Sequence, residues 1–85
     1  MDKETICNMI INSTWKNHEK SNIYKFITGN MLSINGRNNL QYSVNINIDK
    51  IELLMGSEKR YYVEYVNDFT LKLYNNDESF NIMPE

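Results

Sequence analysis

The sequence has 85 residues, of which 41% are hydrophobic, 24% are charged and ten are aromatic. This composition is typical of one soluble globular domain and argues against a disordered chain. The formal net charge is −2 and the pI is about 5.3, which removes the electrostatic attraction that dominates affinity for nucleic acids. The single cysteine, Cys7, cannot form an internal disulfide or, by itself, a zinc site. We therefore expect one domain over residues 1–85, without a cofactor or a nucleic-acid partner.

Neither a membrane span nor a signal peptide is visible in the sequence. No apolar run approaches the roughly 18 residues that a membrane-spanning helix requires. Residues 1–4 read MDKE and lack the basic and then apolar pattern of a signal peptide. The sequence as it stands predicts a cytoplasmic protein, and a secreted or periplasmic one if a signal has been removed.

Residues 3–11 form the one predicted helix. Ile6, Met9 and Ile10 are spaced i, i+3 and i+4, which gives one apolar stripe over about two turns. Two acidic residues near its start favour the N-terminal end of a helix dipole. A frayed arm or a first strand remains the alternative, because the segment is short and rich in β-branched isoleucine.

The rest of the chain reads as short strands joined by turns. The predicted strands lie at residues 12–16, which carry the only tryptophan, and at residues 23–28, 31–34, 40–48, 51–55, 59–66, 69–74 and 80–82. The strongest turn signal is Asn35-Gly36, because a type I′ hairpin turn needs positive φ at both central residues. Gly29-Asn30 is another turn signal, and residues 37–39 are expected to lengthen the Asn35-Gly36 connection.

The longest strand, residues 40–48, has an apolar residue at every second position. This period of two predicts one buried face and one solvated face. The side chains expected to point into the core are Leu40, Tyr42, Val44, Ile46 and Ile48. Short connections between strands force their neighbours to be antiparallel. The sequence therefore predicts an all-β protein with one short N-terminal helix, an antiparallel up-and-down meander of seven to eight strands in a small closed or half-open barrel.

Three stretches of the sequence resemble the lipocalin-like (calycin-type) domains common in small bacterial proteins. Ser13-Thr14-Trp15 stands where those proteins carry Gly-x-Trp, with serine and threonine in place of the glycine and the variable residue. Residues 24–32 (YKFITGNML) look like their Y-x-F…dG-x-L hairpin, and residues 62–73 (YVEYVNDFTLKL) look like their closing hairpin. The resemblance covers residues 10–83 and implies a barrel that binds a ligand without catalysis.

The interior of so small a barrel is expected to be filled by side chains. Eight strands of about six residues enclose little more than their own side chains or one small ligand. The aromatic residues expected to compete for this interior are Tyr24, Phe26, Tyr42, Tyr61, Tyr65, Phe69 and Phe80. We therefore expect a packed core, with a pocket at one mouth at best.

Residue types that commonly carry catalysis are scattered along the sequence. His18 is the only histidine and is expected to be exposed in a polar loop, whereas Cys7 is expected to be buried on the helix rather than to act as a nucleophile. The carboxylates Glu52, Glu58 and Glu64 fall on separate strands or turns and are expected to point outward. Glycoside hydrolysis needs two carboxylates that converge across a cleft, so we do not expect an enzyme.

The run at residues 59–62 (KRYY) is the best candidate for contact with a nucleic acid. Bases stack on aromatic rings beside cations, and this run offers both. The glutamates on either side of it and the acidic balance of the chain argue against that function.

Apolar side chains also fall on the faces predicted to be solvated. They are Ile23, Ile27, Leu54, Tyr62, Val66 and Tyr74. The last three belong to one predicted hairpin and would form a patch, and exposed apolar patches mark interfaces. The alternative is that the N-terminal helix covers them. A homo-oligomer formed through this patch or through an edge strand is one predicted outcome.

Two functions fit these observations. The first is a non-enzymatic, lipocalin-like protein that binds a small apolar ligand or a protein surface, with Trp15, Tyr42 and Tyr62 as apolar anchors and Val66 and Tyr74 as further contacts. The second is a small acidic inhibitor or immunity-type protein that blocks a basic partner by protein–protein binding. The absence of alanine and the abundance of residues with A/T-rich codons suit a mobile-element gene.

Overall fold

The computed structural model describes residues 2–28, 30–57 and 59–85, without the side chains of residues 38 and 39. Its elements are α1 (Lys3–Ile10), β1 (Thr14–Asn17), β2 (Asn22–Ile27), β3 (Met31–Ile34), β4 (Arg37–Asn47), β5 (Lys50–Met55), β6 (Lys59–Asn67), β7 (Thr70–Tyr74) and β8 (Ser79–Pro84). The predicted helix and each predicted strand have a counterpart within a few residues. The predictions made for Gly29 and Glu58 fall outside the described residues.

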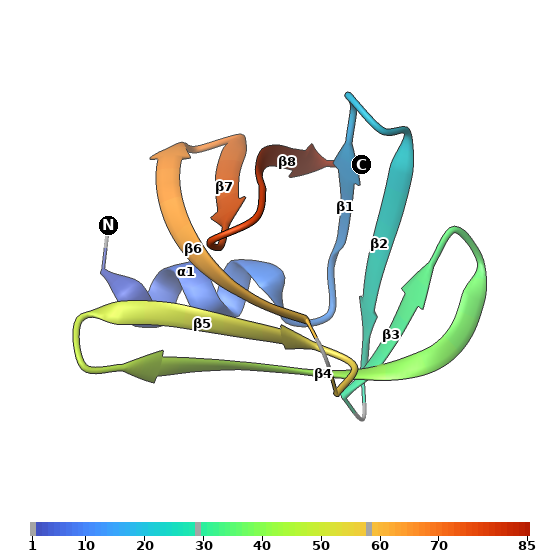
Figure 1. Ribbon diagram of the computed structural model, residues 1–85, viewed down its shortest axis with the longest axis horizontal. Helices are drawn as coiled ribbons and strands as arrows, with labels where there is room; N and C mark the ends of the chain where they lie inside the picture. Colours follow the sequence, from blue (N-terminus) through green and yellow to red (C-terminus); the bar gives the residue numbers. More distant parts are fainter. Residues whose placement is uncertain (1, 29, 58) are drawn as a thin grey trace.

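The eight strands form a closed antiparallel barrel in which each strand pairs with the next along the chain (Figure 1). β8 returns to β1, where Trp15 stands opposite Pro84 and Lys16 opposite Met83. The predicted all-β meander with one short helix is therefore confirmed, in its closed form. Because each described strand has two neighbours, the barrel offers no unpaired edge strand for the edge-paired dimer considered above.

β4 holds the two halves of the barrel together. Its first part pairs with β3, up to Gln41 opposite Met31, and its second part pairs with β5 from Tyr42 opposite Met55. The strand starts at Arg37, directly after a two-residue turn in which Asn35 and Gly36 have φ of 54° and 87°. The predicted type I′ signal is confirmed, but the prediction that residues 37–39 lengthen this connection is wrong, because two residues suffice for such a turn.

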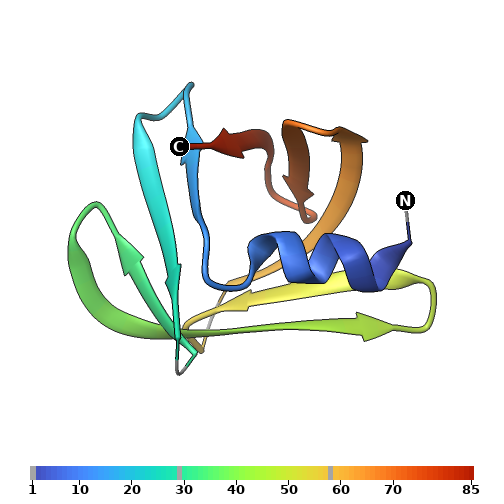
Figure 2. The ribbon, with the colours of Figure 1, turned by 180° about the vertical axis from the view of Figure 1, so that it is seen from behind.

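The helix closes one end of the barrel (Figures 1 and 2). It starts at Asp2, whose carboxylate accepts a hydrogen bond from the backbone N–H of Thr5 at 2.8 Å. Ile6, Cys7 and Ile10 form its buried side and join the barrel core. The alternative that the helix covers the outward apolar residues of the β6–β7 hairpin fails for Val66, which is 48% exposed, whereas Tyr74 lines a recess together with Lys3 and Ile6 of the helix.

A polar contact ties the helix to the strand that follows it. The Ser13 hydroxyl lies within hydrogen-bonding distance of the carbonyl oxygens of Met9 and Ile10. It also accepts a hydrogen bond from the indole N–H of Trp15 at 2.7 Å. The Trp15 side chain, which is buried, therefore has its one polar atom satisfied by the same hydroxyl that marks the helix end.

The barrel interior is packed with side chains, as predicted. The buried apolar residues of the strands are Trp15, Tyr24, Phe26, Leu32, Tyr42, Ile51, Leu53, Met55, Tyr61, Val63, Leu71, Leu73, Phe80 and Ile82. Tyr65 is partly buried against them. Phe69, by contrast, is 69% exposed, because it lies in the turn between β6 and β7 rather than on a strand. The prediction that Phe69 belongs to the interior is wrong.

The prediction of burial along the whole of residues 40–48 also fails at the far end. Tyr42 is buried, and Leu40 and Val44 are partly buried. Ile46 is 48% exposed and Ile48 is 93% exposed. The β4–β5 hairpin extends beyond the packed interior, and Ile48 stands in its turn (Figure 1).

Candidate functional site

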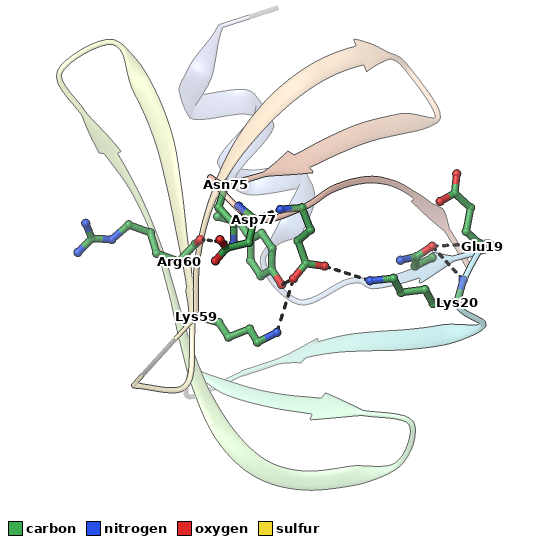
Figure 3. Close-up of polar contacts among 9 residues, drawn as sticks. Glu19, Lys20, Lys59, Arg60, Asn75 and Asp77 are labelled. Atoms are coloured by element: carbon green, nitrogen blue, oxygen red, sulfur yellow. Dashed lines mark hydrogen bonds and ion pairs between the residues drawn. The ribbon is translucent and has the colours of Figure 1, made fainter.

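The mouth of the barrel lies opposite the helix. Neighbouring strands alternate in direction, so the ends of β1, β3, β5 and β7 and the starts of β2, β4, β6 and β8 gather at one end. The helix leads into the start of β1 and therefore lies at the other end. Figure 3 shows polar side chains from the turns and strand ends of this mouth, with the helix behind them.

A pocket of about 350 Å³ opens at this mouth. Its apolar walls come from five strands and consist of Tyr24, Ile34, Leu40, Met55 and Tyr61. Its polar rim consists of Asn22, Ser57 and Lys59. Pockets that bind small molecules measure roughly 300–1,000 Å³ and combine apolar walls with a few polar groups, so this one has the size and the lining of a site for a small ligand.

Gly56 shapes one side of the pocket. It has a φ of 67°, a backbone conformation that side chains disfavour. A Cβ atom at this position would lie 3.3 Å from Cδ2 of Leu40, which also lines the pocket. The glycine thus allows the chain to turn tightly against β4.

Three aromatic rings make the wall beneath the pocket rigid. The Tyr24 and Phe80 rings stack with centroids 6.3 Å apart. The Tyr61 ring meets Phe80 edge to face, with centroids 5.5 Å apart. Such pairs contribute about 0.5–1.5 kcal/mol each beyond the burial of their surface. The apolar wall of the pocket is therefore built from packed strand residues, and Gly56 and Ser57 of the β5–β6 turn complete the lining.

The Glu78 carboxylate contacts Lys20, Lys59 and Tyr61, and the two lysines are labelled in Figure 3. Its Oε1 accepts a hydrogen bond from Lys20 Nζ at 3.1 Å, and its Oε2 accepts one from the Tyr61 hydroxyl at 3.1 Å. Lys59 Nζ lies 3.6 Å from the same Oε2. The hydrogen bond from Lys20 lowers the pKa of Glu78, and that from Tyr61 acts in the same direction. Burial, together with the bond to Glu78, raises the pKa of Tyr61.

Two asparagines hold the turns that carry these groups. Asn75 Oδ1 accepts hydrogen bonds from the backbone N–H groups of Asp77 and Glu78, at 2.8 and 2.9 Å. Asn17 is fully buried, and its Oδ1 accepts from the N–H groups of Glu19 and Lys20, at 3.0 and 3.3 Å. The backbones of Glu78 and Lys20 are thus held in place by hydrogen bonds that do not depend on the contact between their side chains.

The five residues predicted as contacts do not line the mouth pocket. Trp15 is 2% exposed and stands opposite Tyr24, so it lies behind the pocket wall. Tyr42 is 5% exposed and packs edge to face on Phe26, with centroids 5.0 Å apart. Both side chains belong to the core.

The other three predicted contacts lie on the β6–β7 hairpin. The Tyr62 and Tyr74 rings lie side by side on the outer wall, with centroids 5.7 Å apart. The Lys50 ammonium lies over the Tyr62 ring at 4.9 Å. Val66 is 48% exposed and lies further along β6, next to the turn. The structure therefore brings two of these three residues into contact and places the third elsewhere.

The catalytic candidates lie apart from one another. His18 is exposed in the β1–β2 turn and Cys7 is buried on the helix, both as predicted. Burial also raises the pKa of Cys7. Glu64 is exposed on β6. Glu52 is not freely solvated, because Arg60 Nε lies 3.5 Å from its Oε1 and Asn47 Nδ2 donates to its Oε2 at 3.4 Å.

Residues 59–62 alternate between the two faces of β6. Lys59 and Arg60 each lie beside a carboxylate, Glu78 and Glu52. The Tyr61 ring is buried, whereas the Tyr62 ring lies on the outer wall. The two tyrosines therefore do not form one stacking platform. Within residues 2–28, 30–57 and 59–85, no group of three or more His, Cys, Asp and Glu side chains is arranged to hold a metal ion.

Sequence reasoning missed the residues that form the mouth. Tyr24 and Tyr61 were expected in the interior, but nothing linked them to Lys59 or Glu78. The available signal was that the apolar residues at the strand ends near Gly56 occupy positions that point into the barrel. This pattern identifies a site only when the register of the five strands is known.

The described part of the chain contains no helix of the length and apolar character required to cross a membrane. Comparisons of the sequence with protein-family models and with curated proteins, and of the fold with solved structures, found no match.

Proposed function

We propose that this chain is a non-enzymatic, lipocalin-like binding protein that holds a small, mainly apolar molecule in the mouth of its barrel. The observation that carries the proposal is the pocket of about 350 Å³ with walls from Tyr24, Ile34, Leu40, Met55 and Tyr61. Its volume lies at the lower end of the range for ligand pockets, which favours a short-chain or single-ring molecule. The closed eight-stranded form of the barrel is compatible with the lipocalin-like resemblance.

The rim favours a ligand that carries a negative charge at one end. Lys59 is the one cationic side chain that lines the pocket among the described residues. Its ammonium group is 3.6 Å from Glu78, and its side chain is 62% exposed, so this contact is weak. Glu78 keeps its shorter bond to Lys20 when Lys59 turns toward a ligand. An anionic head group would therefore bind Lys59 in place of Glu78 without leaving Glu78 unpaired.

The pKa shifts of Glu78, Tyr61 and Cys7 are compatible with a binding protein. Efficient general acids and bases have pKa values near the working pH. Here the pKa of Glu78 is lowered by its hydrogen bond from Lys20, and the pKa of Tyr61 is raised by burial. The pKa of Cys7 is also raised by burial. In all three groups the shift moves the pKa further from neutral pH.

Titration with octanoate and with 1-octanol, followed by NMR chemical shifts, tests the proposal. The two molecules share an apolar chain and differ in the charge of the head group. We expect octanoate to shift the signals of Tyr24, Met55 and Tyr61, and Lys59→Gln to weaken octanoate binding several-fold while 1-octanol binding changes little.

A pair of matched tryptophan variants localises the binding. Ile34→Trp places a large ring in the pocket and should abolish the shifts. Ile46→Trp makes the same change at a half-exposed isoleucine away from the mouth and should leave them intact. Octanoate binding that survives Ile34→Trp, or shifts confined to other parts of the barrel, would refute the mouth as the ligand site.

A further inference from the structure

Large apolar side chains are exposed at the tips of two neighbouring hairpins. The β4–β5 tip carries Ile48, 93% exposed, and Ile46, 48% exposed. The β6–β7 tip carries Phe69, 69% exposed, and Val66, 48% exposed. Both tips project on the side of the molecule where α1 begins (Figures 1 and 2). Single exposed apolar residues are ordinary, but four at two hairpin tips on the same side of the molecule call for an explanation.

Ile48 is the first central residue of the two-residue β4–β5 turn, a position at which the favoured turns require a positive φ but not an isoleucine. Ile48 has a φ of 61°, in the left-handed region, where β-branched residues are genuine outliers. The other described non-glycine residues with positive φ are Asn12, Ser21, Asn30 and Asn35. Asparagine tolerates this conformation and is abundant in the sequence. A residue that is both strained and fully exposed gains nothing from the interior, so its side chain points to an external contact.

A recess lies between these tips. It measures about 350 Å³ and is lined by Lys3 and Ile6 of the helix, by Asp49 of the β4–β5 turn, and by Glu64 and Tyr65 of β6, among others. The Tyr65 hydroxyl hydrogen-bonds to Asp68, which holds the β6–β7 turn against the strand. The surface therefore combines two projecting apolar side chains with a recess beside them, a shape suited to a macromolecular partner.

The charges around the recess select the kind of partner. The exposed acidic residues of this region are Asp2, Glu4, Asp49, Glu64 and Asp68. The basic residues described there are Lys3 and Lys50, which are exposed, and Lys72, which is half-buried and stands opposite Glu64. The surface is thus apolar at its tips and mainly acidic between them. Two copies of such a surface repel each other, and so does a membrane of anionic lipids.

We propose that the β4–β5 and β6–β7 tips dock onto a basic protein surface that offers apolar pockets for Ile48 and Phe69. Complementary charge steers the two proteins together, and the two buried apolar anchors supply most of the affinity. This proposal gives a place and a chemistry to protein–protein binding by an acidic surface. It does not rest on the proposed ligand site, which lies at the opposite end of the barrel.

Selection of random peptides displayed on phage, with the full chain as bait, tests the proposal. The enriched peptides should combine lysine or arginine with aromatic or aliphatic anchors. A synthetic copy of the most enriched peptide should lose at least about tenfold in affinity for the Ile48→Asn/Phe69→Ser variant. Asp49→Asn/Glu64→Gln should weaken binding less, and should reduce the dependence of the affinity on salt.

Two controls separate this surface from its alternatives. Ile34→Trp, which blocks the mouth pocket, should leave peptide binding unchanged. The wild-type chain should be a monomer in size-exclusion chromatography with light scattering, and should not sediment with vesicles of anionic or zwitterionic lipid. The proposal is overturned if no basic peptide is enriched, if Ile48→Asn/Phe69→Ser binds equally well, or if the tips mediate a dimer or vesicle binding instead.

Discussion

Replacing Ile48 by asparagine should make the protein more stable. The residue has a φ of 61° and its side chain is 93% exposed, so the substitution removes strain and sacrifices almost no buried surface. The left-handed conformation costs an ordinary residue about 1–2 kcal/mol, and asparagine tolerates it much better. We therefore expect the free energy of unfolding to rise by about 1 kcal/mol, which for a domain of this size raises Tm by roughly 4–8 °C.

The matched control is the same change two residues earlier. Ile46 is half-exposed and lies on β4, where asparagine is a poor strand residue. Ile46→Asn should lower stability by about 1 kcal/mol, because it removes roughly half the burial of an isoleucine side chain. Thermal and urea unfolding followed by circular dichroism measure both changes, with the urea slope expected to stay constant. A stability of Ile48→Asn equal to or below that of the wild type would refute the reasoning about strain.

Three further changes test the barrel and its mouth. Glu78→Gln should lower stability at neutral pH by up to ~1 kcal/mol. Because the folded pKa of Glu78 is lowered from 4.5, its contribution is present above that pH and is lost on acidification, so urea unfolding should show the two proteins converging well below pH 4.5. Ser13→Ala should cost about 1–2 kcal/mol, since it leaves the indole N–H of Trp15 without its acceptor, and should shift the tryptophan emission. Gly56→Ala should cost about 1 kcal/mol or more by thermal unfolding, through its φ of 67° and the approach to Leu40.

The strands could be predicted because each depends on information that is local in the sequence. Period-two alternation marked residues 40–48 as a strand, and Asn35-Gly36 supplied the positive φ values of a two-residue turn. Alternation says which face a side chain occupies, but not whether the strand still has a core beneath it. Ile46 and Ile48 therefore looked like core residues, although the hairpin carries them beyond the packed interior.

The mouth could not be predicted for a related reason. Its walls come from five strands, and its rim depends on Glu78 meeting Lys20 and Tyr61, residues that are far apart along the chain. In the sequence, Glu78 is one more acidic residue in a polar turn. Only the closure of the barrel, with β8 beside β1, brings that turn over Lys20. Long-range register, rather than composition, creates the site.

The residues at the two ends of the barrel differ in whether they contribute to the stability of the isolated chain. At the mouth, Glu78, Lys20 and Tyr61 satisfy one another, and each contact contributes to the stability of the isolated chain. At the other end, the β4–β5 turn requires a positive φ at Ile48, and an exposed isoleucine at that position costs stability. A residue that costs the isolated chain stability is best explained by a contact that the isolated chain lacks. A stabilised Ile48→Asn variant that loses its affinity for basic peptides would show that isoleucine at this position lowers stability and provides binding. A variant that keeps its affinity would leave the strained isoleucine without a function.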